Sequence, residues 1–203
     1  GFLISEKMYD QLIPLLKSQT FFNEVKKHKD EEIDINLDLF REMPWNNTFN
    51  SPRWYFHIAG EQTDLSNPYL DVVNHSTIKK RIVIQRTFRH RNMYINYNFL
   101  RNYEDALFVG VKEEYDDLKI QIPNLEFYNP KDFLEIAQII KSSKLFIGNQ
   151  SVCFPIAEAL KVPRLLEASP ETPLVQPVGK NGYDFYFQPH FEKWFKFLYE
   201  KAK

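Results

Sequence analysis

The sequence predicts an α/β protein built on a doubly wound parallel sheet. Short apolar runs recur between residues 79 and 167, and helical patterns separate them. The runs are continuous and do not alternate with polar residues, which is typical of parallel strands covered on both faces. Because strands that alternate with helices favour a parallel sheet, this region is expected to form one.

Five apolar runs are expected to be the strands of this sheet: 81–85, 106–110, 125–128, 145–148 and 164–167. Helical patterns follow the second, third and fourth runs. One covers 112–118, one opens with Asn129 as its cap and Pro130 as its first residue, and one covers 152–160. A less regular helical pattern at 95–103 lies between the first two runs.

The first 76 residues are less regular and are expected to form a partial α/β domain. Helices are predicted at 6–16 and from Ser51 to Gly60, where proline follows serine and glycine ends the pattern. Extended segments are expected at 2–5, 22–28 and 33–40. The segment 191–202 has aromatic residues at helical spacing, so an amphipathic helix is expected there.

Composition excludes several classes of function. The 203 residues carry 26 basic and 27 acidic side chains, so the near-neutral charge provides no reason to expect a nucleic-acid partner. The single cysteine, Cys153, rules out a disulfide within the chain, and the five histidines lack metal-ligand spacing, so no metal is expected. We expect a cytoplasmic protein, or one bound peripherally to the inner face of a membrane.

A basic loop follows the first strand of the predicted sheet. Residues 86–91 contain three arginines and a histidine, and Arg86, Thr87 and Arg89 come directly after the strand. Ligands of open α/β sheets bind beyond the carboxyl ends of the strands, where guanidinium groups suit phosphate oxygens. The alternative is a solvated loop whose arginines pair with acids such as Glu104 and Asp105.

A second polar segment joins the fourth strand to its helix. Asn149, Gln150 and Ser151 lie at a helix N-terminus, where free N–H groups and the helix dipole attract a phosphate. The alternative is that Ser151 merely caps the helix. Cys153 follows in the first helical turn, and its apolar neighbours favour a buried structural thiol.

Two further features are candidate ligand contacts. Glu158 lies two helical turns after Ser151 and could accept hydrogen bonds from ribose hydroxyls, or it could simply face solvent. The irregular segment 169–182 is rich in proline and glycine. There Gly179, Asn181 and Gly182 could bring main-chain N–H groups near a diphosphate, although Asn-Gly is also an ordinary turn.

Two segments resemble the donor-binding half of the ADP-heptose:lipopolysaccharide heptosyltransferase-like family. They are KLFIGNQS at 144–151 and IAEALKVPR at 156–164, and the strand and basic loop at 82–89 are also similar. That family has the GT-B fold, in which two Rossmann-like domains face a cleft. The resemblance covers roughly residues 79–182, about half of the chain, and implies that the turn at 149–151 contacts the donor diphosphate.

The sequence also departs from this family. The family turn usually carries an aspartate and a threonine, where this chain has Asn149, Gln150 and Ser151. The family's N-terminal glycine-rich loop, which holds the acid proposed as catalytic base, has no counterpart here. The catalytic residue is therefore left unassigned, and the N-terminal half is either truncated or degenerate.

The resemblance implies a metal-independent glycosyltransferase that needs no cofactor. It would move a sugar from a nucleoside-diphosphate sugar to a glycan or a lipid-linked glycan. Its parts would be an acceptor-side domain at 1–76, a nucleotide-sugar domain at 77–188, and a helix at 189–203 that crosses back onto residues before Ser76. An incomplete first domain would either associate into homo-oligomers or pack poorly.

Two alternatives remain open at this point. One is a non-catalytic module that binds a nucleotide or nucleotide sugar, which the missing glycine-rich loop favours. The other is a structural protein that keeps only the fold.

Overall fold

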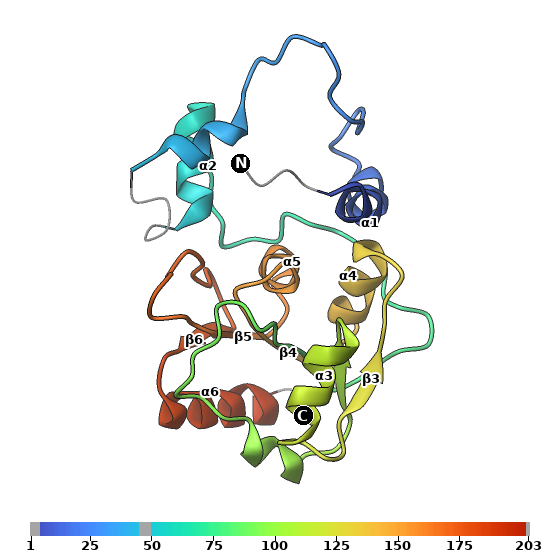
Figure 1. The fold of residues 1–203 in the computed structure, drawn as a ribbon, viewed down its shortest axis with the longest axis vertical. Coiled ribbons are helices and arrows are strands. Elements are labelled where there is room, and N and C mark those ends of the chain that lie inside the picture. The colour runs from blue at the N-terminus through green and yellow to red at the C-terminus, as the bar shows by residue number, and fades with distance from the viewer. Residues whose placement is uncertain (1–4, 45–49, 202–203) are drawn as a thin grey trace.

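A six-stranded parallel sheet lies at the centre of the computed structural model, which describes residues 5–44 and 50–201 (Figure 1). The strand order is β3-β2-β1-β4-β5-β6, and every neighbouring pair is parallel. The strands are β1 (Ile82–Gln85), β2 (Ala106–Val109), β3 (Glu126–Tyr128), β4 (Leu145–Asn149), β5 (Arg164–Glu167) and β6 (Gly182–Phe185). The predicted parallel α/β fold is therefore confirmed.

Each face of the sheet has its own apolar core. Successive side chains of a strand point to opposite faces, so Val83 joins one cluster while Ile82 and Ile84 join the other. Helices α4 (Phe133–Lys141) and α5 (Cys153–Leu160) cover the Val83 face. The opposite face is covered by α3 (Lys112–Lys119), the 3₁₀ turn η2 (Asn98–Asn102) and α6 (Gln188–Lys201).

Helix α4 begins three residues later than the sequence pattern suggests. Asn129 and Pro130 stay outside the helix, and Asp132 is its N-cap, with the side chain accepting a hydrogen bond from Glu135 N–H at 2.8 Å. A carboxylate in that position satisfies a main-chain donor that the helix leaves free. The weaker pattern at 95–103 forms only the 3₁₀ turn η2.

Strand β6 was not expected from the sequence. Residues 182–185 read as the end of an irregular loop, yet they pair with β5 in the register Arg164↔Gly182. Three of the four residues are only partly buried, so the strand lacks the apolar run that marked the others. The ring of Tyr183 stacks on Trp194 of α6 with centroids 4.1 Å apart, and this contact helps to hold the edge strand against the helix.

Helix α6 packs on the sheet and does not cross back to the N-terminal segment. Phe191 stacks on Phe185 of β6 with centroids 4.0 Å apart, and Phe195 packs on Phe99 and Tyr103. Figure 1 shows α6 on the side of the sheet opposite α1 and α2. The expected contact with residues before Ser76 is thus replaced by packing on η2, β5 and β6, which buries Phe191, Phe195 and Leu198 and partly buries Trp194 and Tyr199.

The N-terminal segment forms helices and irregular chain. Its elements are α1 (Glu6–Lys17), the 3₁₀ turn η1 (Leu37–Glu42) and α2 (Ser51–Ala59). Both predicted helices are confirmed, and Gly60 ends α2 in the left-handed conformation at φ 68°. Strands are absent from 5–44 and 50–76; the extended segment expected at 33–40 includes η1 instead, and that expected at 2–5 lies largely outside the described residues.

The N-terminal helices form a further layer above α4 and α5 (Figure 1). Helix α1 packs against α4, and α2 packs against η1, while Ser51 N–H donates to the carbonyl of Leu174 at 3.0 Å. The segment leaves several large apolar side chains exposed, including Phe21 and Ile33. Within the described residues, no helix is both long enough and apolar enough to span a membrane.

Candidate functional site

The polar residues at the carboxyl edge of the sheet converge between β1 and β4. From β1 the chain passes to β2 on one side, and from β4 it passes through α5 to β5 on the other. A sheet whose connections diverge in this way has a crevice outside the carboxyl ends of the two central strands, where ligands of such folds bind. The loops at 86–91 and 149–151 both begin there.

Thr87 and Asn149 join the two strands across this crevice. The Asn149 Oδ1 accepts hydrogen bonds from Thr87 N–H at 3.0 Å and from Thr87 Oγ1 at 3.2 Å. Its Nδ2 donates to the main-chain carbonyls of Thr87 and Arg89 at 2.9 and 2.8 Å. The amide of Asn149 therefore uses both its oxygen and its nitrogen to fix the shape of the 86–91 loop.

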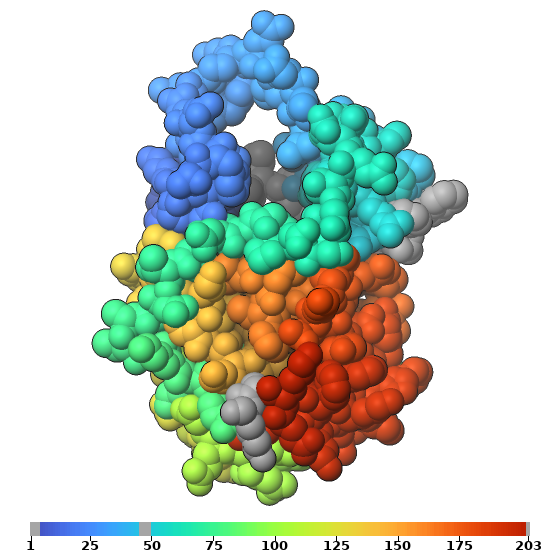
Figure 2. Space-filling view, turned by 180° about the vertical axis from the view of Figure 1, so that it is seen from behind, coloured from blue at the N-terminus to red at the C-terminus, as the bar shows by residue number. Residues whose placement is uncertain are grey.

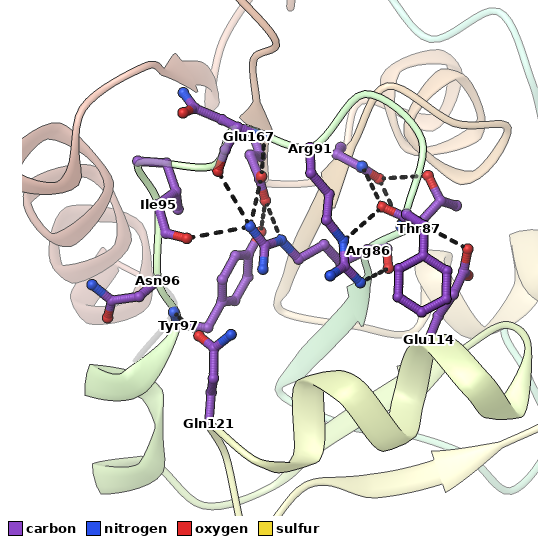
Figure 3. Close-up of polar contacts among 12 residues, drawn as sticks. Arg86, Thr87, Arg91, Ile95, Asn96, Tyr97, Glu114, Gln121 and Glu167 are labelled. Atoms are coloured by element: carbon purple, nitrogen blue, oxygen red, sulfur yellow. Dashed lines mark hydrogen bonds and ion pairs between the residues drawn. The ribbon is translucent and has the colours of Figure 1, made fainter.

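Arg86 is buried in an ion pair with Glu167 at the end of β5 (Figure 3). Arg86 Nε and Nη2 donate to the two carboxylate oxygens at 2.7 and 2.9 Å, and Nη2 also reaches the carbonyl of Ile95. Glu167 accepts two further bonds at 2.8 Å, from the Tyr97 hydroxyl and from Asn92 N–H. The guanidinium group expected to bind phosphate thus holds the loop to the sheet.

The other two arginines of the loop differ from each other. Arg91 Nη1 pairs with Asp117 at 2.6 Å, and its Nε donates to the carbonyl of Thr87. Arg89 is exposed, and within the described part of the chain its guanidinium has no ion-pair or hydrogen-bond partner. The acids that pair with the loop are Glu167 and Asp117 rather than the expected Glu104 and Asp105. Arg89 therefore remains available to an anion.

The surroundings of His90 disfavour its positive charge. Burial, together with the nearby Arg89 charge, lowers the pKa of His90 below its usual value of 6.5. Its Nδ1 lies 2.8 Å from the hydroxyl of Thr172, so the histidine ties the 86–91 loop to the segment after β5. The anion-binding capacity of the loop consequently depends on Arg89.

In the turn between β4 and α5, the side chain of Gln150 has a structural role, whereas the hydroxyl of Ser151 is free to bind a ligand. Gln150 is buried and bonded on both sides, since its Oε1 accepts Ser169 N–H at 3.0 Å and its Nε2 donates to the carbonyl of Thr172. The N-cap of α5 is Val152, and no side chain caps the helix. Ser151 is half-buried and is not the cap, so the capping alternative is not realised and its hydroxyl stays available.

Glu158 lies inside the protein and is fully engaged. Its carboxylate pairs with Lys161 and Arg164 and accepts Val178 N–H at 3.1 Å. Arg164 is completely buried and also donates to the carbonyl of Val178. Because this cluster lies at the C-terminal end of α5, the structure separates Glu158 from the crevice and uses it to anchor the 176–182 segment.

The structure also places Gly179, Asn181 and Gly182 away from the crevice. Gly182 starts β6 beside Arg164, the first residue of β5, so this segment lies at the amino edge of the sheet. The Oδ1 of Asn181 accepts a hydrogen bond from Lys201 at 2.8 Å. A side chain at Gly179, which has φ 84°, would come within 2.8 Å of the main-chain oxygen of Ser66. Gly179 thus permits close packing of two chain segments.

Glu114, which was not predicted from the sequence, reaches the 86–91 loop from α3. Its Oε1 accepts Phe88 N–H at 3.1 Å (Figure 3). Burial raises the pKa of Glu114 above its usual value of 4.5. The rule that locates sites at the carboxyl ends of strands could have found this residue, because α3 directly follows β2. Cys153, by contrast, is inert, since burial raises its pKa to about 12.

Two hollows lie elsewhere, around the N-terminal segment. The larger has a volume of about 1050 Å³ and is mostly apolar, with Leu16, Phe21, Tyr55 and Tyr69 in its wall. Figure 2 shows it between α1 and the chain that includes α2. The smaller, of about 520 Å³, is polar, and it shares Phe56, Thr63, Asp64 and Leu65 with the larger. Among the described residues, no cluster of histidine, cysteine or carboxylate side chains could hold a metal ion.

Comparisons with known proteins support the fold of this chain. No family model matches the sequence, and no curated protein matches it. The fold is similar to that of ADP-heptose lps heptosyltransferase II from E. coli, with a TM-score of 0.57 and 12% identity over 78% of this chain. The match covers 65% of that protein, so this chain spans less than two thirds of its length.

A second solved structure also has a similar fold. The glycosyl transferase family 9 protein from Veillonella parvula matches 74% of this chain and 52% of its own, with a TM-score of 0.50 and 12% identity. The chain therefore has a fold like that of GT-B heptosyltransferases, in agreement with the resemblance read from the 144–164 region.

Proposed function

We propose that this chain belongs to a glycosyltransferase that binds a nucleoside-diphosphate sugar in the β1–β4 crevice. The sugar would pass to a glycan or a lipid-linked glycan without the help of a metal ion. The observation that carries this proposal is the exposed guanidinium of Arg89, which has no ion-pair or hydrogen-bond partner among residues 5–44 and 50–201. Its loop is fixed beside the N-terminus of α5, which no side chain caps.

The donor diphosphate would bind between Arg89 and the start of α5. Guanidinium groups hold phosphate oxygens in bidentate geometry, and a helix N-terminus offers free N–H groups and a favourable dipole. The hydroxyl of Ser151 would add a further donor, whereas that of Thr87 already bonds to the carbonyl of Arg89 and to Asn149 Oδ1. Arg86, Asn149 and Gln150 would act as positioning residues, because their side chains hold the two loops in place.

The same groups would assist departure of the nucleoside diphosphate. When the glycosidic bond to the donor breaks, negative charge develops on the leaving diphosphate, and donors already in place stabilise it. A fixed cation such as Arg89 could do this without a metal. Glu114, on the β2 side of the crevice, is better placed than Glu158 to accept hydrogen bonds from ribose hydroxyls.

The acceptor would approach from the N-terminal segment. Its two adjoining hollows combine an apolar wall with a polar one that includes Arg53, His57 and Glu61. Such a surface suits a molecule with an apolar part and a glycan part. The base that activates the acceptor hydroxyl is not assigned to any residue of this chain.

The alternative is a module that binds a nucleotide or nucleotide sugar without turnover. It would use the same crevice, the same arginine and the same helix N-terminus. Both alternatives require the crevice to bind a diphosphate, and only the first requires sugar transfer.

A thermal-shift panel of nucleoside diphosphates tests the shared requirement. A ligand that binds only the folded state at a hundred times its Kd adds about 2.7 kcal/mol of stability. For a chain of this length each kcal/mol raises Tm by about 2–4 °C. We therefore expect at least one of ADP, UDP, GDP and CDP to raise Tm clearly at millimolar concentration. If none of them does so, while the protein is folded, donor binding by this chain is refuted.

A further inference from the structure

Gln85 has a buried side chain whose amide oxygen lacks a hydrogen-bond partner. It is the last residue of β1 and is 3% exposed. Across residues 5–44 and 50–201, no donor lies within hydrogen-bonding distance of its Oε1. A buried polar group left unsatisfied is destabilising, so such groups in folded proteins call for a physical explanation.

Gln19 is a buried glutamine of the same chain whose side-chain amide has all the hydrogen-bond partners that Gln85 lacks. It is 4% exposed, and its Nε2 donates to the carbonyls of Leu15 and Asp71. Its Oε1 accepts Asp71 N–H at 3.0 Å. The two glutamines are thus equally buried, but only Gln19 has partners for both ends of its amide.

Gln85 ends β1, so it lies at the carboxyl edge of the sheet, directly before the 86–91 loop. Gln85 pairs in register with Gly148 of β4, directly before Asn149. On the β2 side, a Cβ added to Gly110 would lie 3.8 Å from Gln85 Cγ. Gly148 of β4 therefore offers no side chain beside Gln85, and Gly110, which directly follows β2, offers none on the other side. The next residues of the chain, Arg86 and Thr87, begin the proposed donor loop.

We propose that the Gln85 amide binds a hydroxyl group of the donor sugar, which supplies the missing partner. This inference rests on the proposed function. Phosphate oxygens of an ionised diphosphate only accept hydrogen bonds, so they cannot satisfy an amide oxygen. A sugar hydroxyl both donates and accepts, which matches a carboxamide. Gln85 would therefore contribute to recognition of the transferred sugar, whereas Arg89 and α5 would hold the diphosphate.

Thermal unfolding of two matched variants tests whether the amide is unsatisfied. In the absence of ligand, Gln85→Met removes an unpaired polar group and keeps the side-chain length, so Tm should rise by about 2–4 °C. Gln19→Met removes a fully bonded amide and should lower Tm. If Gln85→Met also lowers Tm, a water molecule already satisfies the amide in the free protein and the proposal is overturned.

Calorimetry with paired ligands tests whether the amide recognises the sugar. The pairs are ADP with ADP-glucose, UDP with UDP-glucose, and GDP with GDP-mannose. Gln85→Met should weaken binding of the sugar nucleotide about three- to tenfold and leave binding of the matching diphosphate unchanged. Gln19→Met should alter neither affinity.

The outcomes separate this inference from the proposed function. Equal affinities for wild type and Gln85→Met, or an equal loss for both members of a pair, would overturn the role of Gln85 while donor binding stands. A wild-type protein that binds neither member of any pair would overturn both.

Discussion

Replacing Glu167 with alanine is expected to lower the free energy of unfolding by about 3–5 kcal/mol, because it leaves the Arg86 guanidinium buried without a counter-charge. Arg86 is 3% exposed and Glu167 is fully buried, so solvent cannot compensate. The substitution also removes the acceptor of the Tyr97 hydroxyl and of Asn92 N–H. Chemical denaturation measures this loss directly.

Two comparisons show whether the loss comes from the buried charge. The exposed pair Lys112–Asp116 on α3 serves as the control, and Asp116→Ala should cost no more than about 0.5 kcal/mol. The double variant Arg86→Met/Glu167→Leu should recover much of the stability, since apolar residues of similar volume often replace a buried ion pair without loss. A Glu167→Ala protein as stable as Asp116→Ala would show that Arg86 is not held in this way.

Arg89→Ala is expected to weaken nucleoside-diphosphate binding about tenfold or more, because one charge-assisted hydrogen bond contributes about 1.5–3 kcal/mol. The folded protein should be as stable as wild type, since the Arg89 side chain is exposed and makes no ion pair in the described residues. Calorimetry with the diphosphate that raises Tm most measures the change.

Arg101→Ala is the matched control for this prediction. Arg101 is also an exposed arginine, but it lies in η2, before the amino end of β2, and bonds to Asn98 and to the carbonyl of Gln121. Removing its charge should leave the affinity unchanged. Equal losses in the two variants would mean that the diphosphate responds to net charge and not to a site at Arg89.

The central sheet was predictable because its residues carry the information locally. The apolar runs at 82–85, 106–109 and 145–149 are buried on both faces, so continuous hydrophobicity marked them. Strand β6 lies at the edge of the sheet and is partly exposed. Its sequence therefore lacks the continuous hydrophobic run that identified the central strands. The surface on which α6 packs was not predictable either, because an apolar helix face does not show which part of the protein will cover it.

The location of the candidate site was predictable, but the roles of its residues were not. The rule for open α/β sheets placed the loops after β1 and β4 at one edge. Which arginine stays free depends on acids far away in the chain: Glu167 is 81 residues from Arg86, and Asp117 is 26 from Arg91. The prediction that Glu158 contacts a ribose was wrong for the same reason, since its partners Arg164 and Val178 come from the following strand and loop.

Hydrogen–deuterium exchange in the presence of the tightest-binding nucleoside diphosphate tests the central claim most directly. If the diphosphate binds in the β1–β4 crevice, main-chain exchange should slow at residues 86–92 and 149–154, where the loop and the start of α5 would contact it. Exchange around the N-terminal hollow, at 16–22 and 63–71, should not change. Protection confined to the hollow, with none at 86–92 or 149–154, would contradict the account.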